Sequence, residues 1–289
     1  MSLGARAFIA FQYLLPKHAL TACVYALARS RRLGQLLIRG FSRLYTIDVA
    51  EAAEPNPKGY ATFNEFFTRA LKPGARPLPS TAAAIASPCD GTVSERGTID
   101  GDRLLQARLV AKSHWYTIAE LLGDDPRAAD FIGGEFATIY LAPYNYHRVH
   151  APVTARLVSI GYVPGELFSV NRATAEAVPR LFARNERVVC RFESGSGPSA
   201  LVFVGALNVG SIGIVGLGDL TPARPRRARA VAVPEATARF ERGAELGRFN
   251  MGSTVILLWP RGRCRWADGF RPGATVRMGE VIGEILDAR

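Results

Sequence analysis

The sequence predicts an α+β fold in which an N-terminal helical arm precedes a mainly antiparallel β domain, built as a sandwich or barrel. Three observations support this prediction. The first fifty residues carry apolar side chains at helical spacing. From about residue 80, short apolar runs alternate with glycine and proline and have no regular helices between them. The chain also contains 28 glycines and 18 prolines, a content typical of proteins rich in turns.

The predicted arm consists of three helical stretches, a polar connector and a short helix. Pro16 separates the first two stretches, and the third runs from Leu33 to Leu44. After the connector, Thr62 and Glu65 have the spacing of a capping box, in which each side chain accepts a hydrogen bond from a backbone N–H at the helix start. We therefore expect a helix over residues 63–71.

The predicted β domain is assembled from short apolar runs separated by turn residues. Eight runs are expected to be strands: Gly91–Glu95, Phe136–Leu141, Arg156–Val163, Arg187–Phe192, Ala200–Val209, Ser253–Trp259, Thr275–Arg277 and Val281–Leu286. One helix is expected to interrupt them near residues 114–122. We place the boundary so that residues 1–79 form the helical region and residues 80–289 form the β-rich domain.

The chain is strongly basic, with a net charge of +11. The excess is concentrated in residues 1–47, which hold seven basic residues and no acidic one, and in a second cluster at 224–229. Such surfaces bind nucleic acid or anionic membranes, although a solvated arginine-rich surface explains the charge about as well. In the arm, arginines flank apolar helical faces, which favours helices lying in a membrane interface. An arm packed on the body is the alternative. No run approaches the roughly 18–20 apolar residues that span a bilayer.

Four cysteines are scattered singly through the chain, without a CxxC pair. This pattern predicts neither a structural zinc site nor a disulfide framework, and it favours a reducing compartment. We expect no metal at His147 and His150 either, because no third ligand lies at a recognisable spacing from them.

Two of the four histidines, His147 and His150, lie in the segment YHRVHAP. Histidine is the side chain best suited to proton transfer near neutral pH. Residues three apart on an extended strand face opposite sides, so both reach one site only if the segment bends. Pro143 and Pro152 allow such a bend. A pair of structural histidines is the alternative.

Two further segments combine a turn with a reactive side chain. Asp90 lies in SPCDG, just before a predicted strand, and Ser253 lies in GRFNMGSTVI. An ordinary turn explains either segment in isolation. However, Gly252 lacks a Cβ and permits unusual backbone angles. The Ser253 hydroxyl could therefore approach the carbonyl carbon of the preceding residue.

Together, SPCDG, YHRVHAP and GRFNMGSTVI resemble the phosphatidylserine decarboxylases in their bacterial, membrane-associated form. Supporting matches are YLLPKH near the start, TFNEFFTRALKPGARPL at 62–78 and VGALNVGSI at 204–212. The resemblance therefore extends over nearly the whole chain. Many members carry leucine where this chain has Met251. Because the two side chains are similar in volume, we expect little effect.

The resemblance implies that the chain cleaves itself between Gly252 and Ser253. The Ser253 hydroxyl attacks the Gly252 carbonyl, the resulting ester is eliminated, and hydrolysis leaves a covalent pyruvoyl group and ammonia. Asp90 and His150 match the family's processing triad with Ser253, in which the imidazole accepts the hydroxyl proton and the carboxylate orients the imidazole. His147 is the candidate for positioning the substrate carboxylate or returning a proton during turnover.

The implied reaction converts phosphatidylserine to phosphatidylethanolamine through a Schiff base with the pyruvoyl group, which serves as the electron sink. A lipid substrate favours an anionic membrane over nucleic acid as the partner of the basic arm. It places the protein peripherally on the cytoplasmic face of the cell membrane. The two chains made from the precursor are expected to remain associated, and a homodimer is left open.

Three alternatives remain open on the sequence. Residues 272–285 resemble the hairpins of biotinyl and lipoyl carrier modules, but they lack the lysine that such non-enzymatic modules modify. Ser253 could also serve a serine hydrolase, but no GxSxG motif surrounds it. A decarboxylase of a different serine-headed lipid would share every feature described above.

Overall fold

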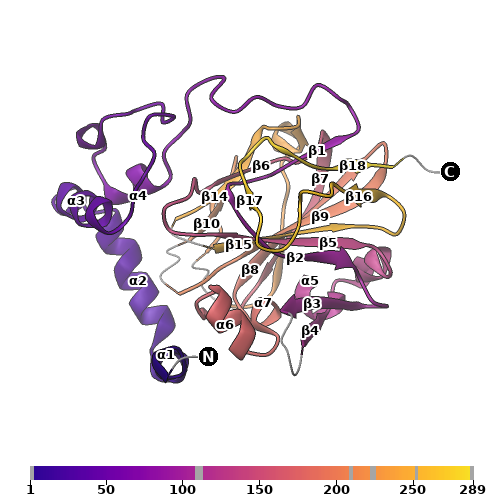
Figure 1. Ribbon diagram of the computed structural model, residues 1–289, viewed down its shortest axis with the longest axis horizontal. Coiled ribbons are helices and arrows are strands. Elements are labelled where there is room, and N and C mark those ends of the chain that lie inside the picture. Colours follow the sequence, from indigo (N-terminus) through magenta and orange to yellow (C-terminus); the bar gives the residue numbers. More distant parts are fainter. Residues whose placement is uncertain (1–2, 108–112, 208–210, 222–225, 251–252, 287–289) are drawn as a thin grey trace.

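The computed structural model describes residues 3–107, 113–207, 211–221, 226–250 and 253–286. Helices form its N-terminal part and lie together at one side of a β-rich body (Figure 1). They are α1 (Leu3–Leu14), α2 (Lys17–Ala28), α3 (Gly34–Leu44), the 3₁₀ turn η1 (Pro57–Gly59) and α4 (Phe63–Phe67). The three predicted helical stretches are confirmed. None of the helices in the described part of the chain is long and apolar enough to cross a membrane.

Helix α4 ends earlier than the sequence predicts. It stops at Phe67 instead of residue 71, because Leu71 forms an antiparallel bridge with Ala52 in the preceding connector. The capping box also differs from the prediction. The N-cap threonine accepts a hydrogen bond from Glu65 N at 3.1 Å, but the Glu65 carboxylate accepts one from Ala61 N at 2.9 Å rather than from the N-cap residue.

The segment expected to be a helix near residues 114–122 begins as a strand. β4 (His114–Thr117) pairs with β3 (Arg103–Ala107), and α5 (Ile118–Leu122) follows it. Aromatic and β-branched residues such as those of β4 favour an extended backbone. Thr117 and Glu120 then start α5 with a complete capping box.

The body is built mainly from antiparallel sheets, as predicted. Its nine-stranded sheet has the order β12-β7-β8-β9-β15-β5-β2-β17, with β13 also paired to β7. These strands are β2 (Gly91–Thr98), β5 (Glu135–Leu141), β7 (Ala155–Val163), β8 (Arg187–Ser194), β9 (Gly197–Val204), β12 (Arg229–Val231), β13 (Arg239–Phe240), β15 (Ser253–Trp259) and β17 (Thr275–Val276). β9 ends at Val204, earlier than the expected end at Val209, because residues 205–207 are not strand, and residues 208–209 lie outside the described residues.

Two smaller sheets and several short helices complete the body. One sheet has the order β11-β10-β14-β6 and the other β1-β18-β16. These strands are β1 (Ala84–Ala86), β6 (Arg148–His150), β10 (Ile212–Ile214), β11 (Gly218–Asp219), β14 (Glu245–Phe249), β16 (Cys264–Trp266) and β18 (Val281–Ile285). The helices are α6 (Arg172–Ala177), α7 (Leu181–Arg184), η2 (Pro126–Phe131) and η3 (Glu235–Thr237).

Strand β15 lies in the interior of the nine-stranded sheet. It pairs along its whole length with β5 and over five residues with β9. Every residue from Ser253 to Trp259 is buried. This continuous apolar pattern is what a strand covered on both faces requires, and it places the start of β15 inside the protein.

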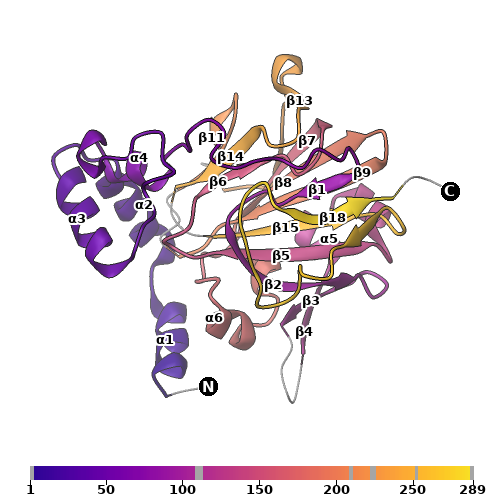
Figure 2. The ribbon, with the colours of Figure 1, turned by 45° about the horizontal axis from the view of Figure 1, so that its top comes forward.

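The helical region contacts the body through polar side chains. α1 runs beside α6 (Figure 2), where Gln12 Oε1 accepts a hydrogen bond from Ser169 N at 2.7 Å. At the start of α2, Lys17 Nζ lies 3.0 Å from Glu166 Oε2. Near the end of α2, Arg29 Nη2 lies 2.6 Å from a carboxylate oxygen of Asp219. The arm is therefore attached to the body at both ends of α2.

Candidate active site

Ser253 is the first residue of β15. Its backbone pairs with Leu141 at the end of β5, and its side chain is fully buried. Among the residues that the structure describes, the Ser253 hydroxyl has no hydrogen-bond partner. Leaving a buried polar group unpaired costs about 1–3 kcal/mol, and buried groups of this kind in native proteins often have a chemical role. Gly252, the other side of the expected cleavage point, lies outside the described residues.

His150 is held at both ring nitrogens. Its Nδ1 lies 2.8 Å from the carbonyl oxygen of Gly243, and its Nε2 lies 2.9 Å from the Tyr146 hydroxyl. A carbonyl oxygen only accepts, so Nδ1 carries the proton and Nε2 accepts from Tyr146. Burial lowers the pKa of His150 and raises that of the Tyr146 phenol. His150 is therefore neutral at pH 7, and its Nε2 carries a lone pair that can accept a proton.

His147 lies where the helical region meets the body. Its ring centroid is 4.0 Å from that of Phe67 in α4, and its Nδ1 donates to Asn145 O at 2.8 Å. Its Nε2 is buried and has no hydrogen-bond partner in the described part of the chain. Burial lowers the pKa of His147 to about 3, and the nearby Arg69 charge acts in the same direction. The ring is thus neutral, with an unpaired lone pair on Nε2.

Asp90 immediately precedes β2 and is held by two donors. Oδ1 accepts from Met278 N at 2.8 Å, and Oδ2 accepts from Arg76 Nη2 at 3.0 Å. Burial raises the pKa of the Asp90 carboxyl, and the Met278 amide and the Arg76 charge oppose that rise. The following Gly91 is required by packing, because a Cβ there would lie 2.5 Å from Tyr140 O.

The backbone brings the Asp90 segment and His150 together. His150 N donates to Pro88 O at 2.8 Å, so β6 runs beside the turn that carries Asp90. The hydrogen bonds found among the described residues do not join Asp90 to His150, or either of them to Ser253. The imidazole is instead oriented by Gly243 O. The processing triad therefore stays a prediction.

Two neighbouring cavities, each of about 250 Å³, open onto these residues. Asp90 and Arg69 line the first, and His150 lines the second. Arg76 and Tyr146 line both. Both cavities also include residues of the helical region, so access to Asp90 and His150 runs along the junction between the arm and the body.

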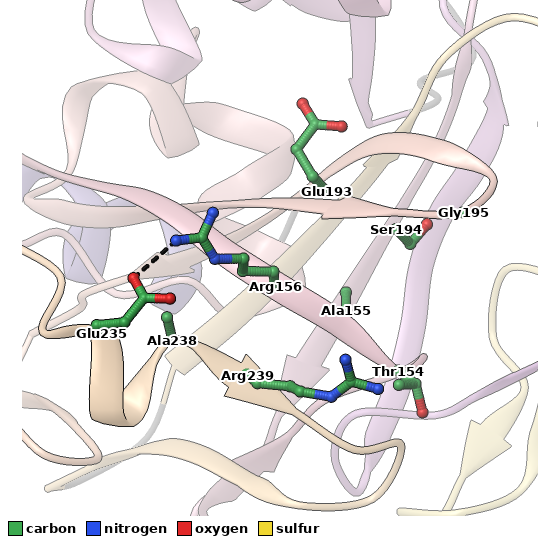
Figure 3. Close-up of a pocket in the computed structure, with 9 residues that line it drawn as sticks. All are labelled: Thr154, Ala155, Arg156, Glu193, Ser194, Gly195, Glu235, Ala238 and Arg239. Atoms are coloured by element: carbon green, nitrogen blue, oxygen red, sulfur yellow. Dashed lines mark hydrogen bonds and ion pairs between the residues drawn. The ribbon is translucent and has the colours of Figure 1, made fainter.

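A larger cavity of about 550 Å³ lies elsewhere, between β7 and the β8–β9 turn (Figure 3). Its most prominent contact is the ion pair between Arg156 and Glu235, at 2.7 Å. Both side chains are largely exposed, so water screens their charges. None of the four predicted site residues lines this cavity, and we assign it no chemistry.

Sequence reasoning missed three groups that hold the predicted residues. Tyr146 could have been found, because it precedes His150 by four residues in the same segment. Arg76 contacts Asp90 from a different part of the chain, and only the match at residues 62–78 pointed to it. Gly243 contributes a carbonyl oxygen, which carries no signal in the sequence.

Comparison with known proteins places the chain among enzymes. A family model described as phosphatidylserine decarboxylase matches residues 63–284, and a second, described as PSD, matches residues 7–46. The chain belongs to the phosphatidylserine decarboxylase family. Three relatives, each named phosphatidylserine decarboxylase proenzyme, agree with this. The protein of Saccharophagus degradans is 48% identical over 96% of this chain and 97% of its own length. Those of Methylococcus capsulatus and Azotobacter vinelandii are 48% and 49% identical over 98% and 96% of this chain, and 98% of their own lengths.

Membership of the phosphatidylserine decarboxylase family confirms the resemblance found in the sequence. It makes the chain a decarboxylase and excludes the carrier-module and serine-hydrolase alternatives. The relatives' names as proenzymes agree with synthesis as a precursor. The matched range 63–284 contains all four predicted site residues.

Proposed function

We propose that this decarboxylase converts phosphatidylserine to phosphatidylethanolamine after cleaving itself between Gly252 and Ser253. The observation that carries the proposal is the Ser253 hydroxyl, which is fully buried and unpaired at the start of a central strand. In the proposed reaction the Ser253 hydroxyl is lost when the pyruvoyl group forms, so the mature protein does not retain a buried hydroxyl without a partner. The family and the relatives' names supply the substrate and the precursor.

The residues around Ser253 fit a pyruvoyl group. Conversion of the serine removes a hydroxyl that has no partner in the precursor, and the rigid backbone of β15 would hold the new group in place. When formed, the group supplies a ketone that accepts the substrate amine and withdraws electrons as CO2 leaves. The protein must supply everything else: binding, orientation and proton transfer.

His150 is the base for processing in this proposal. Its neutral ring is fixed by Gly243 O, so the unprotonated Nε2 points to the Tyr146 hydroxyl. To take the Ser253 proton, Nε2 must exchange this partner, or Tyr146 must pass the proton on. Asp90 acts on His150 through its charge, because its own hydrogen bonds go to Met278 and Arg76.

His147 serves turnover in this proposal. Its Nε2 is a neutral, unpaired acceptor in a dry environment. Such a nitrogen can take up a proton from a neighbouring donor and return it to the product carbon after CO2 has left. Its close, tilted contact with the Phe67 ring restricts the orientation of the imidazole.

The helical region is proposed to rest on the membrane surface, with residues 1–79 as the membrane-association part and residues 80–289 as the catalytic part. Several large apolar side chains of α1 and α3 are exposed, among them Phe11, Leu14, Leu36 and Leu44. Exposed arginines at 31, 32, 39 and 43 accompany them. This combination binds anionic bilayers by insertion and charge attraction. We place the protein on the cytoplasmic face, with its two chains still associated.

The experiment combines intact mass with a turnover assay. Purified protein should separate under denaturing conditions into chains of 252 and 37 residues, and borohydride should add two hydrogens to the shorter one by reducing its ketone. The cleaved protein should release CO2 from anionic vesicles that contain phosphatidylserine. Vesicles that contain another serine-headed lipid test whether the enzyme is specific for phosphatidylserine. Active protein that is wholly uncleaved would contradict the proposal.

A further inference from the structure

The chain segment just before the expected cleavage point is held by a carboxylate on another strand. Asn250 lies three residues before Ser253 and is almost completely buried. Its Nδ2 donates to Asp219 Oδ1 at 3.1 Å and also to Ser211 Oγ. Its backbone N donates to Ser211 O at 2.9 Å. Asn250 is thus fixed by both its side chain and its backbone.

The other oxygen of Asp219 is held by helix α2. Oδ2 accepts from Arg29 Nη2 at 2.6 Å and from the Tyr25 hydroxyl at 3.1 Å. The guanidinium carbon of Arg29 lies 3.7 Å from the centroid of the Tyr25 ring, which orients both groups. One carboxylate therefore joins the arm to the chain that leads into the Gly252–Ser253 bond.

The backbone around Asp219 leaves room for this arrangement. Asp219 lies on β11 and pairs with Gly213 on β10, and β10 pairs in turn with β14, the strand that ends just before Asn250. A Cβ at Gly213 would lie 2.9 Å from Asp219 Oδ1. A side chain there would displace the carboxylate from Asn250, so glycine keeps the contact possible.

We propose that Asp219 is a positioning residue for self-cleavage, which holds Asn250 in place and is itself held by Tyr25 and Arg29 of α2. The inference rests on the proposed function, because it concerns the cleavage of that same site. Attack of a hydroxyl on a neighbouring carbonyl requires the two atoms to be held about 3–3.5 Å apart in the right direction, and a misplacement of 1 Å can cost ~10²-fold in rate. The arm thereby contributes to maturation in the absence of any membrane.

The test follows cleavage of the full chain made by cell-free translation in detergent, without lipid. Denaturing gels over time give the rate of conversion. Asp219→Ala should slow cleavage by roughly tenfold or more. Asp219→Asn and Arg29→Ala are milder changes that should fold, because both side chains are partly exposed. Each should slow cleavage by roughly two- to fivefold, which is the effect expected from losing a partly exposed ion pair. Arg29→Lys should restore most of the rate.

A second measurement separates positioning from general damage. Chains that have been cleaved are isolated, and CO2 release is measured per cleaved chain. This value should match the wild type in every Asp219 and Arg29 variant, because positioning of the precursor ends with cleavage. The matched control is Glu235→Ala, which removes the exposed ion pair of Figure 3 with an almost equal distance and should change neither quantity.

The outcomes distinguish the inference from the function on which it rests. Wild-type protein that never cleaves would overturn the proposed function. If the wild-type protein cleaves and the folded Asp219→Asn and Arg29→Ala variants cleave at the same rate, the role of Asp219 is overturned. Equal losses in cleavage and in turnover per cleaved chain also overturn it, because they indicate a merely structural contribution.

Discussion

The helical region and the β-rich body differ in how completely they cover their apolar side chains. In the body, one large cluster of buried residues extends through the sheets, and β15 has no exposed residue. In the helical region a small core around Phe63 and Phe66 leaves Leu14 83% exposed and Leu44 79% exposed. Burying a leucine is worth about 1.5–3 kcal/mol. The helical region therefore exposes more of its large apolar side chains than the body does, and we propose that a membrane surface covers them.

The two regions meet at the predicted site as well as along α1 and α2. The Phe67 ring of α4 packs against His147, and Arg76 of the following segment donates a hydrogen bond to Asp90. Arg148, between the two histidines, donates to Thr68 O at 2.8 Å. The proposed site residues belong to the body, and residues of the helical region contact them. The predictions below test this division of labour.

The largest effect is expected at Ser253, within the body. Ser253→Ala should give neither cleavage nor CO2 release, because it removes both the nucleophile and the source of the ketone. Intact mass and a CO2-release assay on the same preparation measure this. Ser199→Ala, which alters another buried serine of the same sheet, should behave as wild type. Cleavage of Ser253→Ala at the expected bond would remove Ser253 from the mechanism.

The two histidines should separate maturation from turnover. His150→Ala and Asp90→Asn should block or greatly slow cleavage, since a base and the charge that supports it act as one unit. His147→Ala should still cleave, at least in part, but release CO2 ~10²–10⁴-fold more slowly. The measurement is the cleaved fraction beside turnover per cleaved chain. If His147→Ala does not cleave at all, His147 belongs to processing instead.

The exposed leucines of the arm should govern attachment to lipid. Leu14→Ser and Leu44→Ser should each weaken binding to anionic vesicles by roughly tenfold, following the loss of apolar burial. Raised salt should also weaken binding of the unsubstituted chain to anionic vesicles. Co-sedimentation with vesicles measures both effects. Ile132→Ser is the matched control, because Ile132 is an exposed apolar residue of the body. Equal losses in all three variants would argue against a special role for the arm.

The smallest effect is expected in the acid stability of the junction. The pKa of folded His147 is about 3, below its ordinary value of 6.5, so the unfolded chain takes up a proton that the folded chain refuses. The stability contributed by the neutral ring is therefore full above pH 6.5 and is lost as the pH falls from 6.5 towards 3. His147→Gln should flatten the pH dependence of the unfolding free energy over that range. Denaturant titrations of both proteins between pH 7 and 4 check this, and identical slopes would contradict it.

The sequence was most informative where a pattern is local. Helical spacing located α1, α2 and α3, and continuous apolar runs located β5 and β15. The short strands β10, β11 and β14 were missed, because they contain too few residues to show a period and exist only through pairing with one another. The β4 segment was taken for a helix, because its strand character depends on pairing with β3.

The site was predicted as far as side-chain chemistry reaches. Asp90, His147, His150 and Ser253 were identified because their residue types and motifs are distinctive. The residues that hydrogen-bond to them were not identified. Gly243 acts through its backbone, and Arg76 and Asp219 contact residues distant from them in the chain. Such contacts depend on how the sheets come together, which no local pattern encodes.

The interior position of β15 changes the nature of the protein's stability once the chain is cut. If the chain is cut before Ser253 as proposed, residues 253–286 belong to a separate molecule, which supplies β15 between β9 and β5 and also β16, β17 and β18. The precursor unfolds as one chain, so its midpoint is independent of concentration. The cleaved form unfolds into two chains, and its melting temperature rises with protein concentration, as for any obligate complex. The proposed cleavage would therefore turn folding from a unimolecular reaction into a bimolecular one, and a fully unfolded protein would recover only after its two chains associate again.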